Sequence, residues 1–450
     1  MFSSETRTFY RSLFNIVTPI ALQNLISAAV NSADVVMLGY VGQTALASAS
    51  LASQVQIVLL LFFVGMASGL IMLTAQYWGK GDTQSIETLT GIAFKFSCTA
   101  GLVFFLAAFF FPSFLMRIFT NDSAMIHEGA KYLKIVAPSY FFMSISQVFQ
   151  AVFKSIEHVK TVTALTIGAL LLNIVLNAVF IFGAGPIPAL EIRGAALATT
   201  VARLIEVLAC IFVASRIKDI RLVPSILLMK NKVLSRDFFR FALPALGNEF
   251  VWGAAFAMYS VILGHLGESI VAANSVVGVV RNLASVLCFG MAYGGAILLG
   301  KEMGRGNLEK AKHDASLLWR STVLAGLLAG IIIVLSHPIM LHVARLSDES
   351  RSMLRWLLAS NGASIVGAAV NTVLICGIFR AGGDAKFGLF IDSLIMWGVS
   401  VPLGLLCAFV LKLPPVWVYV ILFLDEFEKM PFIIRHYQSG KWLMNITRKF

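Results

Sequence analysis

The sequence predicts an all-α integral membrane protein with twelve transmembrane helices in two six-helix lobes, related by a pseudo-two-fold axis along the membrane normal. Three observations support this prediction. The chain of 450 residues is 58% hydrophobic and only 13% charged, with a mean hydropathy of +0.85. Its apolar stretches divide into twelve segments of membrane-spanning length. The first part of the chain also matches the second part at a constant offset.

The composition excludes a soluble globular protein. Soluble chains carry about 25% charged residues, and a soluble chain of this length has too much surface to cover with so few of them. The net charge of +12 would indicate nucleic-acid binding in a soluble protein. In a membrane protein, basic residues instead set the orientation and contact anionic lipid. We therefore expect membrane lipids as partners and no nucleic acid.

Apolar runs of about 20 residues are long enough to cross hydrocarbon. The first run is uncharged from Ser12 to Ala33, which is too long for a signal-peptide core and predicts a retained helix. Gly39 and Gly42 supply the turn before the second span. The expected spans are 13–39, 46–77, 91–112, 128–152, 161–183, 194–215, 241–263, 270–299, 314–336, 352–378, 387–410 and 414–434.

The twelfth span gives the weakest signal. Charged residues interrupt it, namely Asp425, Glu426, Glu428 and Lys429. Because charge in hydrocarbon is costly, we expect the inner end of this span at the lipid headgroups or packed inside the helix bundle.

Basic residues predict the orientation. With a cytoplasmic N-terminus, 25 of the 35 Lys and Arg residues fall in or beside cytoplasmic segments, and residues 216–240 alone carry seven. Positively charged loops stay on the cytoplasmic side. We therefore expect a multi-pass protein of the cell membrane (the inner or plasma membrane) with both termini in the cytoplasm. The basic segment is expected to link the two halves.

An internal repeat divides the chain into an N-lobe, residues 1–225, and a C-lobe, residues 226–450. An offset of 225 residues aligns residues 14–81 with 239–306 without a gap and gives 17 identities over 68 positions, including six glycines and one proline. Apolar composition alone does not readily produce such a match. Six spans in each lobe make the lobes parallel repeats. Two such lobes around a central cavity are typical of an alternating-access transporter.

Asp34 is the least expected charge in the membrane. It follows 22 uncharged residues and precedes 45, and an ionisable residue in a span is a functional candidate because its burial is costly. The alternative is an interfacial carboxylate that stays solvated. Asn173 and Asn177 in the fifth span lie four residues apart and share a helix face, although such a pair also commonly joins helices. The sixth span offers Ala195 and Thr199.

Together these residues predict an ion site. One carboxylate, two amide oxygens, one hydroxyl and nearby backbone carbonyls could surround a small hard cation such as Na⁺. The carboxyl group of Asp34, once removed from water, could equally carry a proton. The sequence leaves Na⁺ and H⁺ both open, and we expect no cofactor besides this coupling ion.

The second half keeps the scaffold without this carboxylate, because Tyr259 stands opposite Asp34 in the repeat. We take four polar residues of its spans as candidates for a substrate cavity: Glu249, Arg281, Tyr293 and Asn371. Glu249 and Arg281 could instead neutralise each other across adjacent helices, which would be a structural role.

Four segments carry a resemblance to a known family: PIALQNLISAAVNSADVVMLGYVGQTALASAS (19–50), GAALATTVAR (194–203), NTVLICGIFRAGGD (371–384) and RHYQSGKW (435–442). The chain resembles the multidrug and toxic compound extrusion (MATE) transporters over its entire length. This resemblance implies twelve helices in two lobes and the export of small organic, often cationic, compounds in exchange for Na⁺ or H⁺. We expect a monomer.

The resemblance assigns the first-lobe cation site residue by residue. Asp34 matches the family's first-helix aspartate, Asn173 its fifth-helix asparagine, and Ala195 with Thr199 its sixth-helix pair. Asn177 stands where many members have a second aspartate. With one carboxylate fewer, the site should bind Na⁺ more weakly or use protons.

Two further departures from the family stand out. The acidic site of the second lobe is not reproduced, because Glu249 lies nearer the start of its helix and Asn371 does not clearly match a tenth-helix aspartate. In the first half, KSIEHVK (154–160) replaces an arginine and glycine–aspartate pattern that residues 380–384 retain.

The expected mechanism is antiport by alternating access. Ion binding at Asp34 removes an unpaired charge from a medium of low dielectric constant, after which the first helix can bend. Pro19 is the expected hinge because it lacks a backbone donor. Coupling requires the ion to bind the two states with different affinity.

Two other functions compete with this one. A flippase for lipid-linked oligosaccharides should line its cavity with several basic residues, whereas only Arg203 and Arg281 lie near the middle of an expected span. A membrane-embedded enzyme should carry a catalytic motif, and the sequence contains no HExxH, Asp-rich prenyl motif or phosphate loop. We therefore expect a transporter and not an enzyme.

Overall fold

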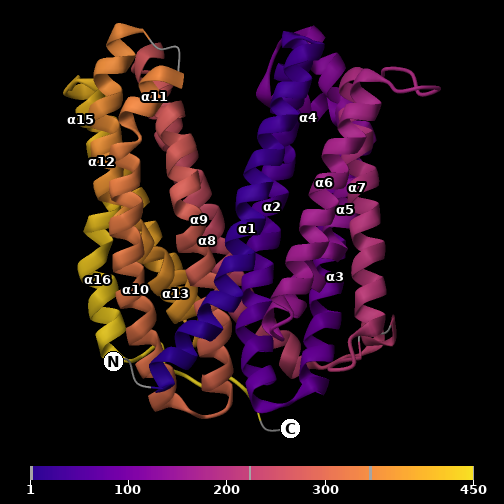
Figure 1. The fold of residues 1–450 in the computed structure, drawn as a ribbon, viewed down its shortest axis with the longest axis vertical. Coiled ribbons are helices and arrows are strands. Elements are labelled where there is room, and N and C mark those ends of the chain that lie inside the picture. The colour runs from indigo at the N-terminus through magenta and orange to yellow at the C-terminus, as the bar shows by residue number, and fades with distance from the viewer. Residues whose placement is uncertain (1–3, 222–223, 344–346, 449–450) are drawn as a thin grey trace. The chain divides into compact units, whose positions relative to one another are not determined.

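The computed structural model of the chain describes residues 4–221, 224–343 and 347–448. Within those ranges the regular secondary structure is helical, apart from one isolated bridge between Ala184 and Ile187. Figure 1 colours the helices in chain order, from indigo at the N-terminus to yellow at the C-terminus. The expected all-α class of membrane protein is confirmed.

The first half begins with two helices of 38 residues each, α1 (Ser4–Val41) and α2 (Gln43–Lys80). Gly42 separates them with a φ of +152°, a backbone conformation that favours glycine, so the expected turn is confirmed. The following helices are α3 (Thr83–Phe110), α4 (Pro112–Phe119), α5 (Ser123–Ser155), α6 (Val159–Phe182) and α7 (Glu191–Arg216).

A short 3-10 segment, η1 (Pro224–Leu228), precedes the second half. Three of its later segments are π-helical: η2 extends α12, η3 joins α13 to α14, and η4 extends α14. The elements are α8 (Lys232–Gly264), α9 (Glu268–Gly304), α10 (Leu308–Leu335), α11 (His337–Val343), α12 (Asp348–Thr372), η2 (Val373–Phe379, π), α13 (Ala385–Asp392), η3 (Ser393–Ser400, π), α14 (Val401–Leu405), η4 (Leu406–Val410, π), α15 (Pro415–Leu422) and α16 (Asp425–Ser439).

Within the described residues, eleven helical segments are long and apolar enough to cross a membrane. The expected twelfth span is formed by two shorter helices, α15 and α16, because the α-helix is interrupted at Phe423 and Leu424. For three of its four charged residues, the interior of a helix bundle is the place observed, whereas Glu428 is partly exposed. Asp425 is 1%, Glu426 8% and Lys429 2% exposed.

The chain divides into two compact units that do not follow the repeat. Unit 1 comprises Met1–Ala21, Ala75–Gly81 and Leu243–Phe450, and unit 2 comprises Leu22–Thr74 and Asp82–Ala242. The beginning of α1 therefore belongs to unit 1, and the beginning of α8 belongs to unit 2. The lobe boundary at residue 225 describes the sequence repeat and remains a prediction. In the structure, the chain passes from unit 2 to unit 1 after Ala242.

Each half thus contributes the start of its first helix to the other unit, which we call the exchange of helix ends. Equivalent contacts in the two units explain it. In unit 2, a Cβ atom on Gly69 of α2 would lie 2.4 Å from the Cα of Ala242 at the start of α8. In unit 1, a Cβ atom on Gly294 of α9 would lie 3.1 Å from the side chain of Val17 on α1. The two glycines are equivalent at the 225-residue offset, and so are Ala242 and Val17. Each unit thus repeats one close helix approach that only a small residue permits.

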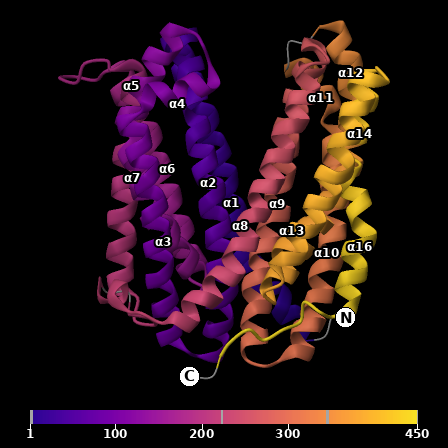
Figure 2. The same ribbon diagram turned by 180° about the vertical axis from the view of Figure 1, so that it is seen from behind.

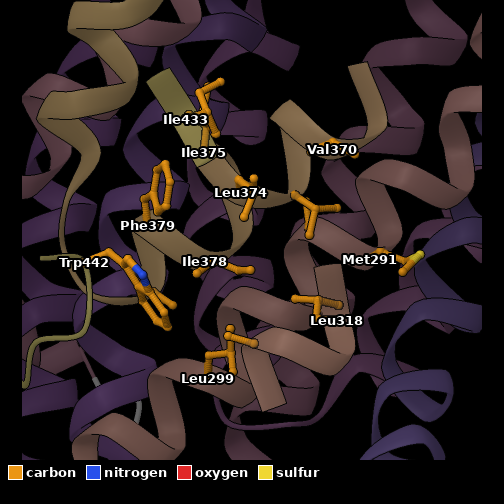
Figure 3. Packing of buried hydrophobic residues seen from close by; sticks show 14 of the residues in the cluster. Met291, Leu299, Leu318, Val370, Leu374, Ile375, Ile378, Phe379, Ile433 and Trp442 are labelled. Atoms are coloured by element: carbon orange, nitrogen blue, oxygen red, sulfur yellow. The ribbon is translucent and has the colours of Figure 1, made fainter. Parts of the chain in front are cut away.

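A hydrophobic cluster in unit 1 holds α9, α10, η2 and α16 together. Leu299, Leu318 and Ile378 are 0% exposed. Figure 3 shows Trp442, which follows α16, beside Phe379 of η2. Between helices in a membrane such clusters act mainly through van der Waals packing. The cluster therefore fixes the chain on both sides of the α16 C-terminus.

The segment after α16 is bound to the C-terminal end of α2, which is also part of unit 1. Figure 2 shows it as the yellow trace that leads to the label C. The amide of Gln76 donates from Nε2 to the carbonyls of Ala381 (2.7 Å) and Met444 (3.0 Å). Its Oε1 accepts from the backbone N–H of Ile446 at 2.8 Å. Gln76 is 0% exposed, so one buried side chain satisfies three backbone groups.

Candidate functional site

The structure brings Asp34 of α1 into contact with Asn177 of α6. The Asn177 Nδ2 donates to Asp34 Oδ1 at 2.6 Å and also to Asn173 Oδ1 at 3.3 Å. The expected common face of the two asparagines is therefore confirmed. Asn177 is 1% and Asn173 8% exposed, and Asp34 is half-buried. Whether these residues bind an ion stays a prediction.

Helix α7 supplies the hydroxyl group of the set. Thr199 lines the same cavity as Asp34 and Asn173. Its Oγ1 donates to the Ala195 carbonyl one turn earlier, at 3.0 Å, which is a common way to satisfy a threonine within a helix. The lone pairs of Oγ1 remain available to a cation. Ala195 takes part only through this carbonyl and does not line the cavity.

The cavity in unit 2 has a volume of about 340 Å³. Apolar side chains of α1, α2 and α6 form much of its wall, and Tyr132 of α5 also lines it. The polar residues among those that line it, besides the set above, are Asn31, Ser50, Ser53, Gln56 and Arg203. A cavity that combines apolar walls with several polar groups suits a small organic molecule.

The positive charge at this cavity is already paired. Arg203 Nη1 lies 2.7 Å from Glu206 Oε2, and Gln150 Nε2 donates to the other oxygen of Glu206 at 3.0 Å. Glu206 is 1% exposed. Asp34, by contrast, forms no ion pair with any residue in the described part of the chain. It is therefore the acid of this cavity that lacks a counter-ion of its own.

The amide of Asn177 has an unused acceptor. Its Oδ1 is buried and accepts no hydrogen bond from the residues that the structure describes. Leaving a buried oxygen unpaired is costly. The orientation of an amide follows from its partners: with its Nδ2 toward Asp34 it suits a carboxylate. Rotated by 180°, it would offer Oδ1 to a protonated Asp34 or to a bound cation.

In the second half, three of the four candidate residues meet at one cavity. Glu249, Tyr293 and Asn371 line a space of about 80 Å³ in unit 1. Arg281 does not line it. On α9, Arg281 lies twelve residues before Tyr293, which is about 18 Å along a helix. Its guanidinium lies 5.5 Å from the ring centre of Phe256.

The alternative considered above, an ion pair between Glu249 and Arg281, is contradicted by the structure. Glu249 Oε1 lies 2.9 Å from Nη1 of Arg380, which follows η2 and is 2% exposed. Arg281 instead stacks on aromatic rings, a favourable environment for a cation. Hydropathy places both arginines in or near spans, but the partner of Glu249 depends on the tertiary packing of η2 against α8.

Sequence reasoning also missed a buried charge cluster beside this cavity. Lys429 lies 3.0 Å from Asp425 and 3.0 Å from Asp392, and all three are buried. The available signal was the four-residue spacing of Asp425 and Lys429, which lets opposite charges meet on one helix face. Nothing in the pattern of α13 pointed to Asp392 as the second partner.

Fold and geometry define a polytopic membrane protein with a partly buried acid beside a cavity in its membrane-spanning part. The MatE family model matches the chain twice, over residues 19–179 and 244–406. The chain therefore belongs to the MatE family of membrane transporters. The two matches begin 225 residues apart, which confirms the internal duplication.

Curated relatives match over nearly the whole chain. The chain is 22% identical over 436 residues to the uncharacterized transporter YisQ of Bacillus subtilis, covering 96% of this chain and 95% of that protein. It is 22% identical over 449 residues to the probable multidrug resistance protein NorM of Thermotoga maritima, covering 97% and 94%. The solved structure of the Vibrio cholerae MATE transporter VcmN in a bent form has a TM-score of 0.86 at 16% identity, covering 98% of this chain and 100% of that one. At this identity the structural likeness concerns the fold.

Proposed function

We propose that this protein is a secondary antiporter that exports small organic, often cationic, compounds and takes up Na⁺ or H⁺ at Asp34. The observation that carries the proposal is the contact of Asp34 with Asn177 beside the cavity of about 340 Å³. A half-buried acid in a membrane helix, without its own counter-ion, is neutralised most readily by a small cation or a proton. Relatives named as multidrug resistance proteins support the substrate class.

Ion uptake would rearrange the contact between α1 and α6. Without an ion, the Asp34 carboxylate accepts from Asn177 Nδ2. A protonated Asp34 no longer needs that donor and can itself donate to Asn177 Oδ1 after the amide rotates. Na⁺ would recruit the same amide oxygen, together with the carboxylate, Asn173 Oδ1 and Thr199 Oγ1. In both cases the binding of an ion or proton at Asp34 on α1 changes the contact with α6 through the side chain of Asn177.

Pro19 is the proposed hinge of this movement. It lies inside α1, two residues before Ala21, where α1 passes from unit 1 to unit 2. Proline removes a helix hydrogen bond and crowds the preceding turn, so bending is cheapest there. A bend at Pro19 would move the Asp34 portion of α1 relative to its beginning. Alternating access then requires Asp34 to hold its ion more tightly in one state than in the other.

The location and assembly follow from the same proposal. The basic loops favour the cell membrane with both termini in the cytoplasm. The exchanged ion then enters from outside as the organic compound leaves. The two repeats on one chain provide both lobes, so we propose that a monomer is sufficient.

The decisive experiment uses the full-length protein in proteoliposomes loaded with a fluorescent organic cation. Na⁺ and pH gradients are imposed separately, which identifies the coupling ion. Asp34→Asn should abolish gradient-driven efflux, whereas Asp348→Asn, a change at an exposed carboxylate in the first turn of α12, should retain it. Undiminished efflux by the Asp34→Asn protein would refute the proposal.

A further inference from the structure

An ammonium group is held between two carboxylates in the polar core of unit 1. Lys429 Nζ lies 3.0 Å from Asp392 Oδ1 and 3.0 Å from Asp425 Oδ2. The two acids come from different helices, α13 and α16. Lys429 is 2% exposed, and a lysine so deeply buried is tolerated only when its charge is paired.

The groups around this lysine are oxygen-rich, as in a cation site. The second oxygen of Asp392 accepts from Asn248 Nδ2 at 2.6 Å. Glu426 accepts from Asn371 Nδ2 at 2.8 Å, while the Oδ1 of Asn371 has no partner among the described residues. Asn371 is 3% exposed. Asn371, Glu426, Asp392 and Lys429 line the same cavity of about 80 Å³.

The other buried cation nearby does not balance these acids. Arg380 pairs with Glu249, and its Nη2 donates to Asn248 Oδ1 at 2.7 Å. Its charge is therefore matched by a carboxylate of its own. Lys429 remains as the cation for Asp392, Asp425 and Glu426. The cluster holds more acid than base, which favours a cation at this place and disfavours an anion.

We propose that Lys429 is the resident cation of a second ion site: its ammonium occupies the place between Asp392 and Asp425 that a diffusible monovalent cation takes when the lysine is removed. Lysine suits this role because it presents a compact charge on a flexible stem. The consequence for transport rests on the proposed function. Unit 1 would carry its cation as part of the chain, so that only unit 2, at Asp34, exchanges an ion with the solvent.

The test replaces Lys429 and then supplies a small cation in the buffer in its place. Lys429→Ala is made in the full-length protein in an Asp34→Asn background, so that ions bound at Asp34 do not contribute. The melting temperature in detergent is measured with methylammonium chloride, sodium chloride or choline chloride at equal ionic strength. Lys386→Ala, at an exposed lysine of α13, is the matched control.

Removing Lys429 should lower the melting temperature by about 5 °C or more, because it leaves buried carboxylates unpaired. Methylammonium should restore at least half of this loss in a saturable manner, and sodium should restore part of it. Choline is too bulky for the vacated place and should not. Lys429→Met, which refills the space without charge, should lose stability without any rescue. Lys386→Ala should show neither loss nor rescue.

Three results would overturn the inference: an unchanged melting temperature in Lys429→Ala, equal rescue by choline, or rescue that is unaffected when Asp392→Asn is added. If Lys429→Ala does not accumulate, Lys429→Ala with Asp425→Asn leaves less acid unpaired. That variant should still respond to methylammonium in a saturable manner and not to choline, and no response would equally overturn the inference. These measurements involve no transport, so their failure is separate from a failure of the antiport proposal.

Discussion

Gly79 of α2 and Gly304 of α9 each pack against the backbone of the other's helix at equivalent points of the repeat. A Cβ atom on Gly79 would lie 2.0 Å from the carbonyl oxygen of Lys301, and one on Gly304 would lie 1.9 Å from that of Gln76. Gln76 and Lys301 are also equivalent at the 225-residue offset. One contact is therefore made twice within unit 1, once from each repeat.

Alanine at either glycine should destabilise the protein. The carbonyl oxygen in the way belongs to a helix backbone that cannot move aside without shifting its neighbours, and overpacking of this kind costs about 1–3 kcal/mol. Gly39→Ala and Gly264→Ala are matched controls from the same repeat, because nothing lies within 4 Å of a Cβ atom there. In thermal unfolding in detergent, Gly79→Ala and Gly304→Ala should have clearly lower melting temperatures than both controls. Equal melting temperatures would contradict the close approach.

Replacing Glu157 by glycine should stabilise unit 2. Helix α5 ends in a turn in which His158 N donates to Phe153 O at 2.8 Å, and Glu157 has a φ of 67°. The corresponding turn after η2 uses Gly383, with a φ of 85°. A side chain in this left-handed region costs about 1–2 kcal/mol, so Glu157→Gly should raise the free energy of unfolding by about 1 kcal/mol.

The control for this change is Glu157→Ala. It removes the same carboxylate but keeps the Cβ atom that causes the strain. A gain of similar size in both variants would show that the charge of Glu157, and not the backbone conformation, is responsible. Urea or thermal unfolding of the two variants side by side distinguishes the cases.

A second carboxylate opposite Asp34 should strengthen cation binding. Asn177→Asp places it at the position whose amide now lies 2.6 Å from Asp34 Oδ1. Two acids so close cannot both stay ionised without a cation between them, and one added charge in a partly buried site should raise the apparent affinity for Na⁺ at least about tenfold. The measurement is the Na⁺ concentration for half-maximal efflux at fixed pH.

Asn177→Ala serves as the counterpart, because it removes the amide without adding charge. Its Na⁺ affinity should fall, and its efflux should become less sensitive to Na⁺. If Asn177→Asp and Asn177→Ala change the affinity in the same direction, charge at this position does not set ion binding.

Loss of the Gln76 amide should release the segment that follows α16. Gln76 is the buried side chain that binds the backbone of Ala381, Met444 and Ile446. Gln76→Ala leaves those three groups unpaired, at a cost of about 1–3 kcal/mol. Limited trypsin digestion should then cut after the exposed Lys441 several times faster, as measured by mass spectrometry. Gln438→Ala, at an exposed glutamine of α16, should leave the rate unchanged.

The sequence predicted most of the helical architecture because lipid leaves a membrane chain few choices. Every backbone group must be satisfied within its own helix, so hydropathy and glycine positions were sufficient to place the spans and the turn at Gly42. The break at Phe423 could not be predicted in this way. The break depends on the charged residues at the start of α16 forming ion pairs and hydrogen bonds inside unit 1. Which residues they pair with is decided by tertiary packing.

The candidate site shows the same limit. Asn173 and Asn177 could be placed on one face from their spacing, and Asp34 stood out by its isolation. The pairing of Glu249 could not be read from the chain, since Arg281 and Arg380 both stand in apolar stretches of the sequence and hydropathy does not rank them. Lys429 appeared as an interruption of a span, whereas its contact with Asp392 makes it part of a cluster.

The exchange of helix ends between the repeats has a consequence for any attempt to divide the molecule. A gene cut after codon 225 would give two polypeptides, neither of which contains all of unit 1 or all of unit 2. The N-terminal product would keep Val17 but lack the Gly294 helix it packs on, and the C-terminal product would keep Ala242 without Gly69. Neither fragment should fold alone, and co-expression should restore both by complementation.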